Sequence, residues 1–196
     1  MKTPQTAVTT INLPSHHRPR LRFSVAVLTA SLIFLTCLST ALASLQKNWR
    51  YCEKCHAMFY DGYPNKGRCP AGGGHSAEGF TFVLSYDIPE TGNAQAHWRY
   101  CQKCHAMFFN GYPVAGVCAA GGPHQAQGFK FVLQHDAKFP NTTQGSWRYC
   151  EKCHVLFYNG YPDKGRCAAG EGHKAQGFNF VLRYMANLDE EVDAHD

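Results

Sequence analysis

Short hydrophobic groups separated by turn-forming residues occur three times along this chain. In the first copy, aromatic residues gather at 49–51 and 58–60, and apolar and polar positions alternate over 80–84. Aromatic and β-branched residues in runs of this length favour strands. Glycine-containing segments at 61–64 and 71–74 are typical of turns. The pattern predicts short antiparallel strands joined by two tight loops, with almost no helix.

The three copies begin at Trp49, Trp98 and Trp147, so the period is 49 residues. No insertion separates any pair of copies, and the first and third share 28 of 38 positions. A fixed period of this length indicates a repeat architecture. We therefore divide the chain into a leader at 1–43, repeat 1 at 44–87, repeat 2 at 97–136, repeat 3 at 146–185 and an acidic tail at 186–196.

Each repeat contains the spacing C-x2-C-x13-C-x5-H. Two cysteines at this spacing in a tight turn direct both sulfurs at one ion, and a glycine-rich loop can return the second pair of side chains to it. Three thiolates and one imidazole suit tetrahedral zinc, and a closed set of four ligands is structural rather than catalytic. The predicted ligands of three zinc ions are Cys52, Cys55, Cys69 and His75; Cys101, Cys104, Cys118 and His124; and Cys150, Cys153, Cys167 and His173.

A repeat of this size needs such a staple, because domains below about 40 residues rarely build a sufficient core. Structural zinc supplies about 10–16 kcal/mol of apparent stabilisation. Lys54, Lys103 and Lys152, between the paired cysteines, can offset the negative charge of the thiolates. We expect small all-β metal-stapled units arranged as three tandem zinc-ribbon-like repeats. A compact pseudo-threefold, β-trefoil-like domain is the alternative, since about 49 residues per repeat would accommodate it.

The sequence C-x-x-C-H in each repeat supports a different cofactor, because it is the signature of covalent c-type haem attachment. His56, His105 and His154 would then be axial ligands, and the protein would be a triheme c-type cytochrome-like electron carrier. Haem leaves the third cysteine of every repeat unused, and repeats rich in glycine and polar turns offer poor haem pockets. Zinc is therefore preferred, with these three histidines beside the ligands and without a ligand role.

Disulfides are a third interpretation of the cysteines. Cys37 lies in the leader, so nine cysteines remain, three in each repeat. An odd number in each repeat leaves one thiol over in any pairing confined to that repeat. A metal-buffering or redox protein that uses free thiolates remains open on the same grounds.

The motifs together resemble a known repeat. W-R-x-C-x-K-C-x-x-[LM]-F, G-x-C-x-A-G-x-x-H and G-F-x-F-V-L, which recur between Trp49 and Tyr184, are similar to a zinc-ribbon-like repeat of exported bacterial and fungal proteins. The resemblance implies zinc and export, and it implies no established activity. In that family the residue after the second cysteine is not always histidine, which argues against haem.

The first 43 residues are typical of a secretory signal peptide. Basic residues up to Arg22 precede an apolar run at 23–38, and Ala41-Leu42-Ala43 fits an A-x-A cleavage pattern. We expect a secreted protein with no membrane association after cleavage; an uncleaved N-terminal anchor is the alternative. The formal charge of +5 includes four basic residues of this leader, so the remainder is nearly neutral and gives no argument for nucleic acid.

No nucleophile–base pair or carboxylate pair recurs in the three repeats, so we expect no enzymatic activity. Aromatic side chains are the remaining candidates for recognition. We expect Trp49, Phe59, Phe80 and Phe82 to form a small core. Tyr63, Tyr112 and Tyr161, in Gly-Tyr-Pro turns, are the predicted ligand-binding residues. Three such sites on one chain would bind an extracellular glycan or protein multivalently.

Overall fold

The computed structural model describes residues 44–137 and 141–185, which belong to one compact unit. The expected leader and acidic tail lie outside the described residues. Within the described ranges no helix has the length and apolarity to cross a bilayer. Residues 44–137 and 141–185 form nine strands: β1 (Ser44–Cys52), β2 (Met58–Tyr60), β3 (Ala77–Tyr86), β4 (Ala94–Cys101), β5 (Met107–Phe109), β6 (Ala126–Gln134), β7 (Thr143–Cys150), β8 (Leu156–Tyr158) and β9 (Ala175–Tyr184).

Each repeat folds as a long, a short and a second long strand. In repeat 1, Trp49 on β1 is opposite Tyr60 on β2 and Phe82 on β3, and both pairings are antiparallel. The same register recurs in repeats 2 and 3, at positions 49 and 98 residues later. The pairing of the two long strands in each repeat is interrupted by two β-bulges. Beside them in repeat 1, Asn48 and Gly79 both adopt φ of 67°. The predicted strands are confirmed, and the outer ones are longer than the aromatic groups that indicated them.

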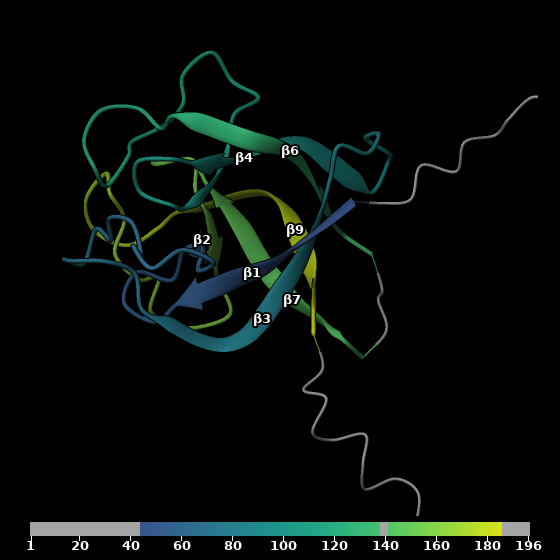
Figure 1. Ribbon diagram of the computed structural model, residues 1–196, viewed down its shortest axis with the longest axis horizontal. Helices are drawn as coiled ribbons and strands as arrows, with labels where there is room; N and C mark the ends of the chain where they lie inside the picture. Colours follow the sequence, from purple (N-terminus) through teal and green to yellow (C-terminus); the bar gives the residue numbers. More distant parts are fainter. Residues whose placement is uncertain (1–43, 138–140, 186–196) are drawn as a thin grey trace, which may run out of the picture. The chain divides into compact units, whose positions relative to one another are not determined.

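The long third strands of the repeats pair with one another in a cycle. Tyr86 of β3 lies opposite Phe131 of β6, and Tyr184 of β9 lies opposite Phe82 of β3. A bridge between His135 and Phe180 joins repeats 2 and 3. The result is a nearly closed, barrel-like sheet in which β1 and β3 lie side by side (Figure 1). The all-β, metal-stapled class is confirmed. The repeats adopt the compact pseudo-threefold arrangement and do not fold as three separate tandem units.

The short strands form a second cycle. The amide of Tyr60 donates to the carbonyl of His105 at 3.0 Å, Phe109 donates to His154 at 2.9 Å, and Tyr158 donates to His56 at 2.9 Å. Each contact joins one repeat to another, so β2, β5 and β8 close a ring through the backbone. A backbone ring of this kind fixes the relative position of the turns that carry the cysteines.

The core is shared by all three repeats. Trp49, Trp98 and Trp147 are fully buried, and each packs edge-on against a phenylalanine of another repeat, as Trp49 does on Phe131 at 5.1 Å between ring centres. A single repeat has too little apolar area to bury its tryptophan, so the three repeats complete one core. One expected core residue was wrong: Phe80 is 43 % exposed. Its ring stacks on Tyr184 at the surface instead.

Candidate metal centres

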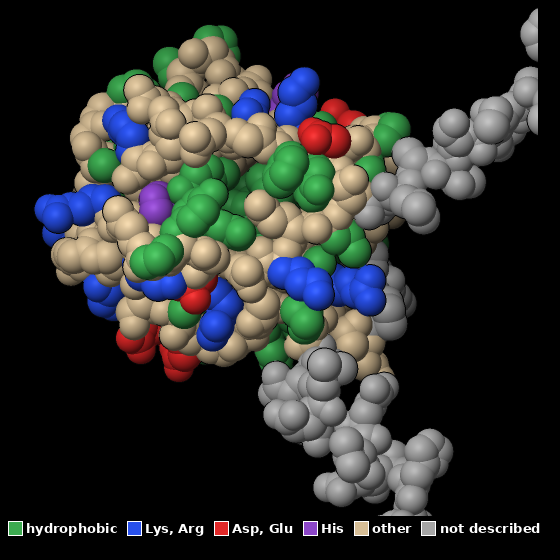
Figure 2. Space-filling model, in the orientation of Figure 1, with side chains coloured by type: hydrophobic (Ala, Val, Ile, Leu, Met, Phe, Trp, Pro, Cys, Tyr) green, Lys and Arg blue, Asp and Glu red, His purple; other side chains and the backbone are tan. Residues whose placement is uncertain are grey.

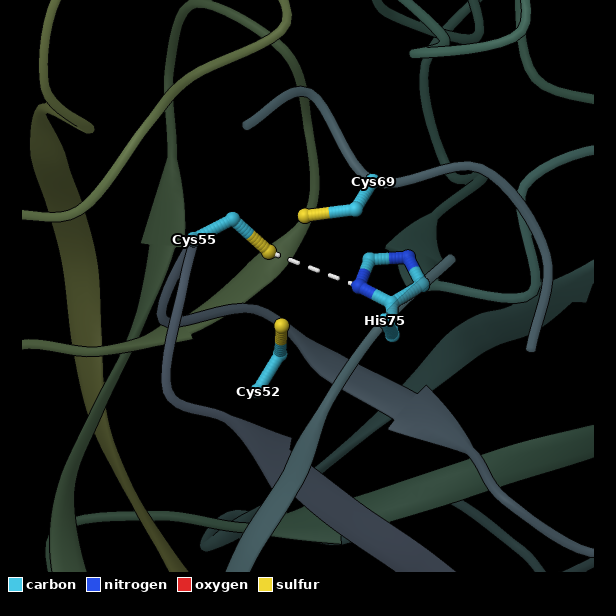
Figure 3. A group of neighbouring side chains, drawn as sticks. All are labelled: Cys52, Cys55, Cys69 and His75. Carbon is cyan, nitrogen blue, oxygen red and sulfur yellow. Dashed lines mark hydrogen bonds between the residues drawn. The ribbon is translucent and has the colours of Figure 1, made fainter. Parts of the chain in front are cut away.

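The structure brings together the four predicted ligand side chains of every repeat. One atom from each of Cys52, Cys55, Cys69 and His75 lies within 4.8 Å of the others, and all four residues are buried (Figure 3). The corresponding groups in repeats 2 and 3 have the same spacing and burial. The protein therefore contains three Cys3His groups close enough to bind metal ions.

Two tight turns present these ligands. Cys52 ends β1, and the amide of His56 donates to its carbonyl at 2.8 Å, which turns the chain back through Cys55. In the loop between β2 and β3, the amide of Cys69 donates to the carbonyl of Gly73 at 2.9 Å. Gly73 has φ of 63°, a conformation that favours glycine, and no atom lies within 4 Å of the place its Cβ would take. Local backbone geometry therefore accounts for both the C-x2-C turn and the C-x5-H loop.

The separations of the ligand atoms exclude disulfides. Cys55 Sγ lies 3.5 Å from Nδ1 of His75, and Cys104 and Cys153 have the same separation from their histidines. The Sγ atoms of Cys101 and Cys118 are 3.8 Å apart. A disulfide bond is about 2.05 Å long, and all nine cysteines of the described chain are free. The sulfurs surround a common point and do not bond in pairs.

The buried thiols and imidazole of each group shift one another's pKa values. Contacts with Cys55 and Cys69 lower the pKa of Cys52 far below its ordinary value. Burial alone would lower the pKa of His75, but its contacts with Cys52 and Cys69 outweigh burial and raise that pKa to about 9. Thiolate and neutral imidazole are the forms that bind a metal, so metal uptake by the group would release protons.

A lysine holds the glycine-rich loop in each repeat. Lys54 Nζ donates to the carbonyls of Gly72 and Gly74 at 2.8 and 2.6 Å. Lys152 makes both corresponding contacts in repeat 3, and Lys103 makes the first of them, to Gly121, in repeat 2. These lysines place positive charge next to the loop that carries the third cysteine and the histidine, as their position between the paired cysteines suggested.

Each ligand histidine also contacts the next repeat. Nε2 of His75 lies 3.0 Å from the carbonyl oxygen of Cys104, and since a carbonyl only accepts, Nε2 carries the hydrogen. His124 makes this bond to Cys153, and His173 makes it to Cys55, both at 3.0 Å. Outer-layer bonds of this type fix the tautomer and orientation of a ligand histidine. Sequence reasoning missed this ring, because the spacing within one repeat does not show which repeat lies beside it.

The histidines of the C-x-x-C-H sequences lie outside the three ligand groups. His56 has φ of 63°, and its ring packs against Tyr51 and Tyr161 with centroid distances of 5.4 and 5.9 Å. His105 and His154 occupy the same positions in their repeats. The cavity beside His75, His124 and His173 measures about 20 Å³, roughly one water molecule. The site suits a metal ion better than a covalently attached haem.

The three tyrosines of the Gly-Tyr-Pro turns are about half exposed and lie at the junctions between repeats. Tyr63 is 49 % exposed, and its ring centre is 6.3 Å from Tyr100 and 5.9 Å from His105, both in repeat 2. Tyr112 lies against repeat 3, and Tyr161 lies against repeat 1. Each of the three tyrosines therefore packs against the repeat that neighbours its own.

Comparison of the chain with family models, curated proteins and solved structures finds no match. The metal-binding groups are therefore assigned from the geometry of the chain's own residues.

Proposed function

We propose that the protein is an exported, non-catalytic zinc-binding repeat protein that acts as a multivalent binding module for cell-surface glycan or protein. The geometry of the Cys3His groups carries the zinc assignment. Bonds of about 2.3 Å to sulfur and about 2.0–2.1 Å to nitrogen in a tetrahedron require edges of about 3.8 Å between sulfurs and about 3.5–3.6 Å between sulfur and nitrogen. Two separations between sulfurs, Cys101 to Cys118 at 3.8 Å and Cys150 to Cys167 at 3.9 Å, agree with these edges, and so does the 3.5 Å from sulfur to nitrogen in each repeat. All four ligand atoms of each group lie within 4.8 Å of one another.

A structural role fits these sites better than a catalytic one. The four side chains of each group are buried and close together, and as ligands they would fill a tetrahedral site and leave no coordination position for water or substrate. The acidic residue between the paired cysteines, Glu53 or Glu151, is replaced by Gln102 in repeat 2. A mechanism common to the three repeats therefore has no recurring acid there.

The exposed tyrosines support a binding role. Tyr63, Tyr112 and Tyr161 are 49, 51 and 51 % exposed, although an aromatic ring gains free energy when it is covered. Their equivalence in three repeats would let one chain contact a repetitive surface at several points, which raises avidity without tight single contacts. The basic and apolar leader with its A-x-A pattern would deliver the chain to such a surface.

The decisive experiment purifies the exported form and records its metal content and its absorption spectrum. We expect about three zinc ions per chain and no Soret band, and we expect chelator, but not reductant, to unfold the protein. Cys69→Ser should reduce the zinc content to about two ions, because zinc uses Cys69. The matched variant His56→Asn should keep three ions. Bound iron with a strong Soret band, unaffected by Cys69→Ser, would support the electron-transfer alternative.

A further inference from the structure

A groove runs between repeat 1 and repeat 2 on the surface of the sheet. Its volume is about 330 Å³, within the range of about 300–1,000 Å³ typical of small-molecule sites. Repeat 1 contributes Gln46, Tyr60 and Tyr63 to one side, and repeat 2 contributes Tyr100 and Phe129 to the other. We call it groove 1/2. Neither repeat alone could form it, so the groove is a product of the compact arrangement.

The same groove recurs between repeat 3 and repeat 1. It measures about 140 Å³, and each of its eight lining residues is the counterpart, one or two repeat periods away, of a residue in groove 1/2. Thus Gln144, Tyr158 and Tyr161 correspond to the three residues of repeat 1 named above. Recurrence of the whole lining makes a chance depression in the surface a poor explanation.

Aromatic rings in groove 1/2 are held rigidly and remain accessible. Tyr63 meets the ring of Tyr60 edge-on at 5.1 Å, and 49 % of Tyr63 is exposed. On the opposite side, Phe129 stacks on Tyr86 at 3.8 Å and is 39 % exposed. Figure 2 shows that hydrophobic side chains gather on the face drawn, beside polar and basic groups. Rings fixed in place before binding lose little conformational entropy when a ligand packs on them.

The polar atoms of groove 1/2 are neutral. Gln46 Oε1 accepts a hydrogen bond from Trp49 Nε1 at 3.0 Å, which fixes the side chain and leaves its Nε2 group as a donor. Gln127 and the phenols of Tyr60 and Tyr63 add further neutral donors and acceptors. The lining contains no charged residue. Such a groove suits an uncharged ligand that has both an apolar face and hydroxyl groups.

We infer that groove 1/2 is the principal binding site for a neutral, pyranose-containing carbohydrate. The C–H face of a sugar ring packs on the exposed rings of Tyr63 and Phe129, and its hydroxyls bond to Gln46 and Gln127. This assignment rests on the proposed binding function and names its ligand class. A stacked nucleotide fits less well, because sites that stack bases normally run along a positively charged groove that receives the phosphates.

The other junctions differ from groove 1/2 in ways that weaken them. The groove between repeats 3 and 1 is smaller and has Glu78 where groove 1/2 has Gln127. At the junction of repeats 2 and 3, Phe109 replaces Tyr60 and removes one hydroxyl. The three junctions are therefore unequal, with the first the strongest.

The test titrates the zinc-loaded exported protein with methyl pyranosides and tetrasaccharides of glucose, mannose, galactose, xylose and N-acetylglucosamine, followed by protein NMR and calorimetry. At least one sugar should bind saturably and perturb groove 1/2. Tyr63→Ala should weaken that binding at least tenfold, Tyr63→Phe should retain it within about threefold, and Tyr161→Ala should have the smaller effect. All three variants should keep three zinc ions and remain fully folded at the temperature of the titration, which separates recognition from folding.

Absence of binding across the panel, or equal affinity in Tyr63→Ala, would overturn the carbohydrate site. So would tighter binding of a nucleoside monophosphate or an acidic saccharide at the same residues. A zinc-loaded protein that still attaches to cells, but only through a protease-sensitive partner, would overturn this inference while the proposed binding function stands. A protein that attaches to no surface and binds no sugar would remove both.

Discussion

At the scale of single residues, one glycine in each repeat allows the neighbouring repeat to approach closely. Gly67 has φ of 67°, and a Cβ at this position would lie 2.2 Å from the carbonyl oxygen of Cys104. Gly116 and Gly165 approach Cys153 and Cys55 in the same way, at 2.3 and 2.4 Å. The carbonyl that each glycine approaches is the one that accepts a hydrogen bond from a ligand histidine. Glycine here permits both the backbone conformation and the contact between metal-binding turns.

We predict that Gly67→Ala destabilises the zinc-loaded protein by about 3 kcal/mol or more, because left-handed strain and overpacking add. Gly79→Ala is the matched control: Gly79 has the same φ of 67°, but no atom lies within 4 Å of its Cβ position. That variant should lose only about 1–2 kcal/mol, the cost of the conformation. Denaturant unfolding measures both. Equal losses would show that the close approach to Cys104 does not limit stability.

The grouping of the candidate ligand side chains was predictable from the sequence, and the position of the neighbouring histidine was not. The spacing from Cys52 to His75 is local, and turn geometry within one repeat brings those side chains together. His56 continues the same turn in a left-handed conformation, with its ring against another repeat. A sequence motif records the histidine but not its φ, so C-x-x-C-H permits the haem interpretation until the backbone is known.

At the scale of strands, an aspartate after the third strand of repeats 1 and 2 joins the repeat to its neighbour. Asp87 follows β3, and its amide donates to the carbonyl of Lys130 on β6 at 2.8 Å. Its carboxylate accepts from the amide of the same lysine at 3.1 Å. Asp136 makes the same two bonds to Asn179 on β9. At the third junction Met185 occupies the equivalent position and keeps the backbone bond to Thr81, at 2.9 Å.

Asp87→Ala should therefore destabilise the protein by about 1–2 kcal/mol, through the loss of one side-chain hydrogen bond and the less favourable left-handed conformation of alanine. Asp87 has φ of 52°. Asp87→Asn keeps an acceptor oxygen and tolerates this conformation, so its stability should stay within about 0.5 kcal/mol of wild type. Thermal and denaturant unfolding distinguish them. If the asparagine variant loses as much as the alanine variant, charge rather than geometry explains the contact.

The existence and direction of the strands within a repeat followed from the sequence, whereas the pairing between repeats did not. Aromatic groups around Trp49 and Phe59 indicated strands because alternate side chains had to be buried. Phe80 lies in a similar apolar run, yet it is exposed, because Gly79 introduces a bulge before it. Bulges and edge pairing depend on which strand lies opposite, and a single repeat does not contain that strand.

At the scale of the whole molecule, two buried clusters each contain residues of all three repeats. The nine cysteines of the described residues lie in a single buried cluster with Phe59, Phe108 and Phe157, and the loops of the three repeats gather there (Figure 1). A second buried cluster contains the tryptophans of all repeats. The sequence left open whether the repeats fold independently or as one domain, because an equal period is compatible with both. Burial of each tryptophan against its neighbours decides for one domain.

This continuity predicts that loss of one metal site destabilises all three repeats. Cys101→Ser should lower the zinc content to about two ions per chain and keep unfolding as a single transition at reduced temperature. Hydrogen exchange, measured by mass spectrometry on peptides of each repeat, should show loss of protection in repeats 1 and 3 as well as in repeat 2. His75 donates to Cys104 of repeat 2, and Cys153 of repeat 3 accepts from His124, so both neighbours contact the damaged site directly.

Tyr112→Ala, an exposed change in the same repeat, should leave zinc content and protection unaltered. Loss of protection confined to repeat 2 would instead mean that each repeat folds alone around its own ion and that the shared core contributes little.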